Sequence, residues 1–266
     1  MASASATTSS DPIADRFAAL ASAGRKALVV YVTAGHPDRA SSVALLRALA
    51  AAGADVIELG VPFSDPLADG PVIQRSSQVA IAQGMNFEGA LAIAAEAAVD
   101  VPLVLFSYLN PVMAAGPEAL TRARAAGIAG LLITDLPVGA DRAREAAFGA
   151  GPLAFVRLVA PTTPVARMAE IARHGRGFVY CISRTGVTGE QANVAADLPA
   201  TVARLREATT LPICVGFGIS SAAQARAVAE LADGVVIGSA VVRLAEQSID
   251  AAAAFVAEVR RALDAA

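Results

Sequence analysis

The chain of 266 residues lacks the features that would direct it to a membrane or to nucleic acid. No uninterrupted apolar stretch reaches the roughly 20 residues that a helix needs to span a bilayer. Its 21 lysines and arginines form no run or stripe beside 24 acidic residues, so nucleic-acid binding is not expected. Residues 1–10 have neither a basic segment nor an apolar core, which argues against a signal peptide. We therefore expect a disordered tail over residues 1–10 and one domain over residues 11–266.

The sequence does contain a regular alternation of short apolar runs and helix-like segments. Eight runs are rich in apolar and β-branched residues, and they recur about every 29 residues, the length of one βα unit. The predicted strands are Leu28–Thr33, Asp55–Leu59, Leu103–Ser107, Gly130–Thr134, Leu153–Val159, Gly177–Ile182, Ile213–Gly216 and Gly234–Gly238. Because no linker or change of composition interrupts them, we predict an α/β protein with a single (β/α)8 TIM barrel. An open doubly wound sheet is the alternative.

Two intervals between predicted strands are longer than the others. They follow the second strand, over residues 60–102, and the sixth strand, over residues 183–211. Extra length after a barrel strand lies at the C-terminal face, where active sites of this fold are found. Extended loops after strands 2 and 6 are therefore expected to carry function.

Several common catalytic groups are scarce. Lys26, the only lysine, precedes the first predicted strand and so lies at the wrong end of a barrel for a Schiff-base lysine. The only histidines are His36 and His174, too few for a metal site built on imidazoles, so no catalytic metal is expected. No Walker motif or glycine-rich dinucleotide fingerprint follows the first strand, so no nucleotide cofactor is expected either. Cys181 and Cys214 lie in apolar runs, which fits buried, reduced thiols in a cytoplasmic protein. Proton transfer is therefore expected to fall to carboxylates or tyrosines.

Two acidic residues have the right position for that role. Glu58 stands near the end of the second strand, where alternation places it on the same face as Val56 and Gly60, pointing into the barrel. Burial would raise its pKa, as suits an acid–base catalyst, although a structural glutamate held by a backbone or arginine partner is the alternative. Asp69 follows in the proline-rich segment 62–71, which is either a stiff catalytic loop or merely a rigid surface loop.

Glycine-rich segments follow the last three strands. Residues 216–220 and 238–240 come after the seventh and eighth strands, the usual place for a phosphate in this fold. Their backbone N–H groups, with the dipole of a short helix beginning at Ser239, would attract an anion. Residues 183–189, after the sixth strand, are expected to form a flexible lid.

Together these segments resemble the α subunit of tryptophan synthase from about Asp11 onward. The resemblance rests on the hallmark over residues 58–71, which begins Glu58-Leu59-Gly60-Val61-Pro62, and on residues 183–189 and 216–219. It implies retro-aldol cleavage of indole-3-glycerol phosphate to indole and glyceraldehyde 3-phosphate, without a cofactor in this chain. One departure is His36, which stands between Gly35 and Pro37 where the family typically has aspartate.

The resemblance also implies residue roles. Glu58 would protonate indole C3 and take the glycerol hydroxyl proton, while Asp69 would accept the indole N–H and stabilise the indolenine cation. Tyr180 would be a third catalytic residue, and Thr188 the lid residue that meets Asp69 on closure. The implied substrate-binding residues are Tyr31, Tyr108, Thr188 and Phe217, and the implied phosphate-binding residues are Gly189, Gly218, Gly238 and Ser239.

The family resemblance further implies a partner, a β subunit that carries pyridoxal phosphate, in an α2β2 heterotetramer. The loop that begins at Tyr108 resembles the docking loop, and the expected docking residues are Pro62, Asp65, Asn110 and Pro111. Two alternatives stay open: a stand-alone lyase that releases indole, and a chain that acts mainly as a non-catalytic activator of the β subunit. Glu58 and Asp69 favour a lyase over an activator, because an activator has no need of a buried glutamate.

Overall fold

Eight parallel strands form a closed barrel in which each strand pairs with the next and β8 pairs with β1. The structure is a computed structural model that describes residues 11–183, 197–216 and 218–265. The strands are β1 Ala27–Thr33, β2 Val56–Gly60, β3 Leu103–Ser107, β4 Ile128–Ile133, β5 Ala154–Val159, β6 Val179–Ile182, β7 Ile213–Gly216 and β8 Gly234–Ile237. The single (β/α)8 barrel predicted from the sequence is confirmed, and the open sheet is excluded.

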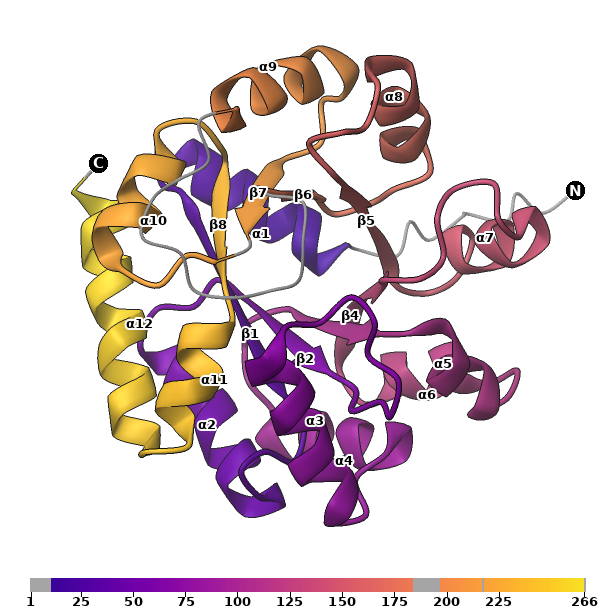
Figure 1. The fold of residues 1–266 in the computed structure, drawn as a ribbon, viewed down its shortest axis with the longest axis vertical. Helices are drawn as coiled ribbons and strands as arrows, with labels where there is room; N and C mark the ends of the chain where they lie inside the picture. Colours follow the sequence, from indigo (N-terminus) through magenta and orange to yellow (C-terminus); the bar gives the residue numbers. More distant parts are fainter. Residues whose placement is uncertain (1–10, 184–196, 217, 266) are drawn as a thin grey trace, which may run out of the picture.

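The helices surround the ring of strands, except α1, which lies at its centre in the view of Figure 1. They are α1 Pro12–Ser22, α2 Arg39–Ala51, α3 Pro71–Ala82, α4 Phe87–Ala97, α5 Leu109–Ala114, α6 Ala119–Ala125, α7 Arg142–Gly149, α8 Val165–Arg173, α9 Leu198–Ala208, α10 Ala222–Ala229, α11 Ser239–Ala245 and α12 Ile249–Asp264. Among the described residues, none of these helices is both long enough and apolar enough to cross a membrane.

Two apolar layers lie on opposite sides of the strands. Side chains such as Leu28 and Val30 on β1 point outward and pack with the surrounding helices. Their neighbour Val29 points inward and packs with Val56 and Val236 in the centre of the barrel. This alternation explains why strands covered on both faces are apolar at nearly every position. It also sets which residues near the strand ends face the barrel mouth.

Helix α1 closes the N-terminal end of the barrel. The Asp11 side chain caps it by accepting hydrogen bonds from Ile13 N and Ala14 N, each over 3.1 Å. Ile13 is fully buried, and a Cβ atom added to Gly130 of β4 would lie 2.6 Å from its Cδ1 atom. The lack of a side chain at Gly130 therefore lets α1 enter the barrel, which leaves the C-terminal end as the open mouth.

A buried carboxylate joins the first and last parts of this closed ring. Asp55, 1% exposed, pairs with Arg16 of α1 over 2.6 Å and with Arg260 of α12 over 2.9 Å. It also accepts the backbone N–H of Leu28 over 2.8 Å. Two arginines and a backbone donor thus compensate the burial of this charge.

The region after β2 is long, as expected, because it holds a loop over residues 61–70 and two helices, α3 and α4. Most of the expected loop after β6, residues 184–196, lies outside the described residues. The prediction that Tyr108–Pro111 forms a loop is wrong, because Tyr108 is the N-cap of α5 and the next residues form its first turn. Pro111 is tolerated there since the first N–H groups of a helix have no intrahelical acceptor.

Candidate active site

Glu58 lies inside the barrel mouth, on β2, where it pairs with Tyr31 of β1 and Val104 of β3. Its side chain is 1% exposed, and neither carboxylate oxygen has a hydrogen-bond partner among the described residues. Burial without compensation disfavours the charged form, and it raises the pKa of Glu58 to about 8. The alternative of a glutamate held by an arginine or backbone partner is therefore not supported, and Glu58 is a neutral acid at pH 7.

Two glycines make room for tyrosines beside Glu58. A Cβ atom on Gly60, at the end of β2, would lie 2.2 Å from the Tyr31 hydroxyl oxygen. A Cβ atom on Gly216, at the end of β7, would lie 2.4 Å from the Tyr180 hydroxyl oxygen. Both tyrosines are buried, and burial raises the pKa of each well above its usual value. This role of Gly60 and Gly216 was not predicted from the sequence, although a glycine in a strand signals close approach of another group.

Asp69 is held over the mouth by the loop after β2 and by Tyr108. The Tyr108 hydroxyl donates to Asp69 Oδ2 over 3.1 Å and accepts from the backbone N–H of Ala68 over 2.9 Å. The Gln74 side chain donates to the Asp69 carbonyl oxygen over 2.8 Å. Burial raises the pKa of Asp69 to about 6, while the bond from Tyr108 opposes that rise. Asp69 is therefore mainly ionised at pH 7, unlike Glu58.

The expected phosphate-binding residues that the structure describes lie just after β7 and β8, at the edge of the barrel mouth. Gly218 follows β7 and has a φ of +85°, which favours glycine. Gly238 follows β8 as the N-cap of α11, and Ser239 begins that helix. The expected site residues Thr188, Gly189 and Phe217 lie outside the described residues. Adjacent strands β7 and β8 thus bring the described glycines to one side of the mouth.

The expected docking residues differ in exposure. Asp65 and Asn110 are exposed and Pro111 is half-buried, whereas Pro62 is buried and offers little surface to a partner. Two exposed apolar side chains that the sequence analysis did not single out accompany them. Leu67 of the β2–α3 loop is 90% exposed, and Met113 of α5 is 43% exposed.

The departure at His36 has a local explanation. This side chain is 3% exposed, and its Nε2 atom lies 3.2 Å from Glu246 Oε1, just after α11. Arg75 of α3 approaches the same glutamate oxygen over 3.4 Å. His36 is thus paired with the carboxyl group of Glu246. Burial is the main cause that lowers the pKa of His36.

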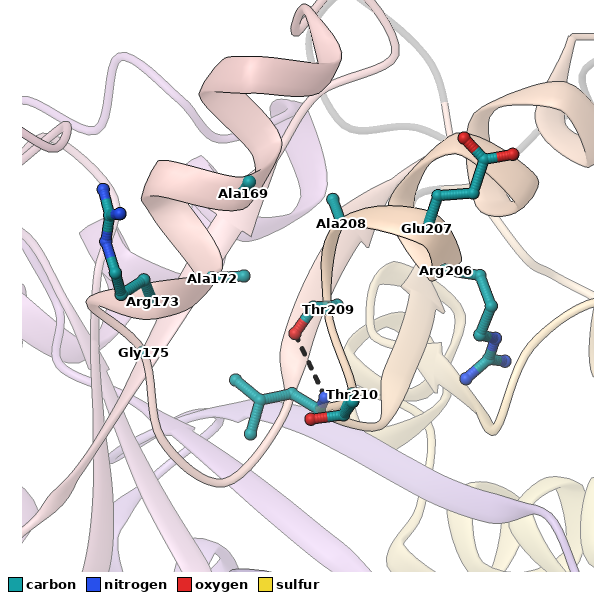
Figure 2. A pocket seen from close by; sticks show the side chains of 10 residues that line it. Ala169, Ala172, Arg173, Gly175, Arg206, Glu207, Ala208, Thr209 and Thr210 are labelled. Carbon is teal, nitrogen blue, oxygen red and sulfur yellow. Dashed lines mark hydrogen bonds between the residues drawn. The ribbon is translucent and has the colours of Figure 1, made fainter.

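A pocket of about 430 Å³ lies elsewhere, between the ends of α8 and α9 (Figure 2). Arg173, Arg206 and Thr210 are among the residues that line it. It belongs to the N-terminal end of the barrel, since Gly175 precedes β6 and Thr210 precedes β7. Arg206 is also engaged by Asp233 over 2.5 Å. The pocket therefore holds none of the buried carboxylates of the mouth.

Other reactive groups do not form a second centre among the described residues. No group of three or more His, Cys, Asp or Glu side chains there could hold a metal ion. Cys181 and Cys214 are free and buried, and burial raises the pKa of the Cys181 thiol to about 12. The mouth with Glu58 and Asp69 is therefore the candidate active site.

Comparisons with known proteins show the family of this chain. The family model described as tryptophan synthase alpha chain matches residues 17–265. A tryptophan synthase alpha chain from Laribacter hongkongensis is 49% identical over 95% of this chain and 99% of its own length. One from Geobacter sulfurreducens is 45% identical, covering 94% of this chain and 98% of that protein.

Solved structures give the same answer. Tryptophan synthase subunit alpha from Legionella pneumophila is 32% identical, with a TM-score of 0.89, 97% of this chain covered and 100% of that chain. A chain of Mycobacterium tuberculosis tryptophan synthase in an aminoacrylate-bound form is also 32% identical, with a TM-score of 0.86 and coverages of 96% and 100%. This chain therefore belongs to the tryptophan synthase alpha chain family, the lyases that cleave indole-3-glycerol phosphate in tryptophan biosynthesis.

Proposed function

We propose that Glu58 and Asp69 together perform the retro-aldol cleavage, each in a different protonation state. The observation that carries the proposal is that Glu58 is buried, has no hydrogen-bond partner in the described part of the chain, and lies in the same mouth as Asp69. The pKa values of about 8 and about 6 leave the first carboxyl protonated and the second ionised at pH 7. Two carboxyl groups whose environments separate their pKa values are suited to separate acid and base roles.

The proposed reaction returns Glu58 to its starting state. Glu58 first gives its proton to indole C3, and the positive charge that develops on the indole ring is stabilised by ionised Asp69. The Glu58 carboxylate then removes the proton of the glycerol hydroxyl. The bond between indole C3 and the glycerol carbon breaks, its electron pair returns to the ring, and glyceraldehyde 3-phosphate and indole are released. No external reductant, oxidant or cofactor is needed in this chain.

The remaining residues position the substrate in this proposal. Tyr180 stands beside Glu58 as a third active-site group, and Tyr31 and Tyr108 line the apolar side of the mouth. Phe217, which lies outside the described residues, keeps the substrate-binding role that the resemblance implies. Backbone N–H groups at Gly218, Gly238 and Ser239, joined by Gly189, bind the phosphate. Thr188 also lies outside the described residues, and its proposed role of meeting Asp69 rests on the family resemblance alone.

The dependence of kcat/KM on pH tests the assignment. We expect a bell-shaped profile for indole-3-glycerol phosphate cleavage, with apparent pKa values of about 6 and about 8. Activity rises with pH as Asp69 loses its proton, and it falls as Glu58 loses the proton that it must donate. A profile that keeps rising above pH 9 would contradict a role for neutral Glu58 as the acid.

Membership of the family implies a β subunit as partner, and we propose an α2β2 complex in the cytoplasm with pyridoxal phosphate in the β subunit. The docking surface consists of Asp65, Asn110 and Pro111, with apolar contact from the exposed side chains of Leu67 and Met113. Pro62 supports the loop from inside. This surface borders the mouth, so docking and closure of the site can be coupled.

The variant Asn110→Asp tests the docking surface. Position 110 lies in the first turn of α5, where the helix dipole tolerates a new negative charge, so the fold should be kept. We expect the charge to weaken assembly with the β subunit and to reduce β-dependent activation. Cleavage by the isolated chain should persist, because Asn110 has no role in proton transfer. Sedimentation of mixed subunits, with assays of each variant alone and mixed, measures both effects.

Thr210→Asp is the matched control. It adds the same charge at an exposed position at the opposite end of the barrel, in the pocket of Figure 2. Assembly of Thr210→Asp should be unchanged. If Asn110→Asp also assembled and activated normally, the turn that begins α5 would not belong to the docking surface. Assays of the unmodified chain also separate the alternatives: a stand-alone lyase would gain nothing from the β subunit, and a mere activator would not cleave substrate.

A further inference from the structure

A chain of three buried hydroxyl groups leads away from the active-site mouth. The Tyr31 hydroxyl lies 3.4 Å from Thr33 Oγ1, which lies 2.7 Å from Ser76 Oγ. Ser76 Oγ in turn donates to the carbonyl oxygen of Ile73 over 2.9 Å. The three residues are 6%, 1% and 0% exposed, so water does not compete for these bonds. The chain links β1 to α3, the helix that follows the Asp69 loop.

The end of this chain sets its direction. A carbonyl oxygen can only accept, so the bond to Ile73 uses the single proton of Ser76. Ser76 must then accept from Thr33, and Thr33 must accept from Tyr31. In this direction three protons make three hydrogen bonds. In the opposite direction Ser76 loses its bond to the carbonyl and only two hydrogen bonds remain. That arrangement is unfavourable, because buried polar groups need hydrogen-bond partners.

The fixed direction has a consequence for Tyr31. Burial raises the pKa of this phenol well above its usual value, so it keeps its proton, and that proton is held by Thr33. The lone pairs of the hydroxyl oxygen therefore stay free to accept a hydrogen bond. This oxygen lies against the backbone of Gly60, in the mouth, and Tyr31 is the strand neighbour of Glu58.

We infer that Tyr31 is a hydrogen-bond acceptor for a hydroxyl group of the glycerol chain of the substrate, and that Thr33 and Ser76 are positioning residues that keep it in that role. The inference rests on the proposed function and adds a polar contact to a residue otherwise expected to pack against indole. A hydroxyl donor is favoured over the indole N–H, because that group is assigned to Asp69. Tyr31 thus distinguishes a hydroxylated substrate from a deoxy analogue of the same shape.

Equilibrium titration in the Glu58→Gln background tests this, since the substrate then stays uncleaved. The two probes are indole-3-glycerol phosphate and indole-3-propanol phosphate, which keeps the indole N–H and the phosphate but lacks both glycerol hydroxyls. We expect Tyr31→Phe to weaken binding of the first probe roughly 2- to 12-fold, the value of one hydrogen bond, and to leave binding of the second unchanged. Equal loss for both probes, or no loss for either, would overturn the inference.

A double-mutant cycle tests the positioning role. Ser76→Ala should also weaken the hydroxylated probe selectively, but it should have no further effect once Tyr31→Phe is present. Ser77→Ala is the matched control, because Ser77 is the next residue on α3, is similarly buried and is outside the hydroxyl chain. Thermal unfolding of each variant monitors folding, and Thr33→Val provides a second interruption of the chain should Ser76→Ala be unstable. Additive losses from Tyr31→Phe and Ser76→Ala would contradict the positioning role.

The same titrations separate this inference from the proposed function. If the Glu58→Gln parent bound neither probe, the proposed function would fail and the inference with it. If the parent bound both probes but Tyr31→Phe did not discriminate between them, the inference alone would fail.

Discussion

Glu58→Gln is expected to reduce cleavage of indole-3-glycerol phosphate by at least about 10²–10⁴-fold, the usual contribution of general acid–base catalysis. The amide keeps the size of the side chain but can neither donate the proton to indole C3 nor take one from the glycerol hydroxyl. Substrate affinity should change little, because the carboxyl group is buried and neutral at pH 7. Single-turnover assays and equilibrium titration measure the two quantities separately. Turnover close to that of the unmodified chain would refute the catalytic assignment.

The stability of the same variant provides an independent check. In the folded chain Glu58 stays protonated up to about pH 8, whereas in the unfolded chain it loses its proton near 4.5. The unmodified protein therefore loses stability as pH rises between these values, at about 1.4 kcal/mol per pH unit. Glu58→Gln lacks this loss, so its free energy of unfolding relative to the unmodified chain should increase from pH 5 to pH 8. Denaturant unfolding at both pH values shows whether the difference grows.

Asp69→Asn should lower kcat about 10²–10³-fold, the effect of removing one group that stabilises charge in a transition state. The amide can still accept the hydrogen bond from Tyr108, so the loop after β2 should keep its position. What the variant loses is the negative charge opposite the developing indolenine cation. The assay is steady-state kinetics, and a change confined to KM would make Asp69 a binding residue instead.

Tyr108→Phe is the informative partner of that variant. It removes the bond that opposes the rise in the pKa of Asp69, so the pKa should move further upward from about 6. The acidic limb of the pH profile should then shift to higher pH, while the basic limb, which belongs to Glu58, should stay in place. A shift of both limbs would point to a general disturbance of the mouth.

The barrel could be predicted from the sequence because each strand is covered on both faces and reads as a short apolar run. The bounds of β6 show where this reasoning stops. The run from Gly177 to Ile182 is apolar throughout, yet Gly177 has a φ of +82° and the strand begins at Val179. The first turn of α5 was likewise missed, since the resemblance described the segment from Tyr108 as a loop and only the coordinates show that Tyr108 caps a helix.

For the site, the position of Glu58 along its strand was enough to select it. Side chains alternate between the two faces of a strand, and this alternation predicts that Glu58 points into the barrel. Asp69 was selected by its place in the proline-rich loop, but its role of stabilising the indolenine cation came only from the family resemblance. The link between Thr33 and Ser76 could not be predicted from sequence, since these residues are 43 positions apart and only the packing of α3 on β1 joins them. The space that Gly60 and Gly216 leave for two tyrosines likewise requires coordinates.

The shared carboxylate of Asp55 also bears on how the chain can fold while it is being synthesised. Its partner Arg16 leaves the ribosome before it, but Arg260 is 205 residues further along the chain. At roughly 5–20 residues per second, this interval lasts about 10–40 s. For most of that time β1 has no β8 to pair with, since β8 is made only near the end of the interval, so the nascent barrel has an open strand edge that association with another chain could occupy. Pairing of β8 with β1 closes the ring, and the arrival of α12 soon afterwards supplies the second arginine for Asp55.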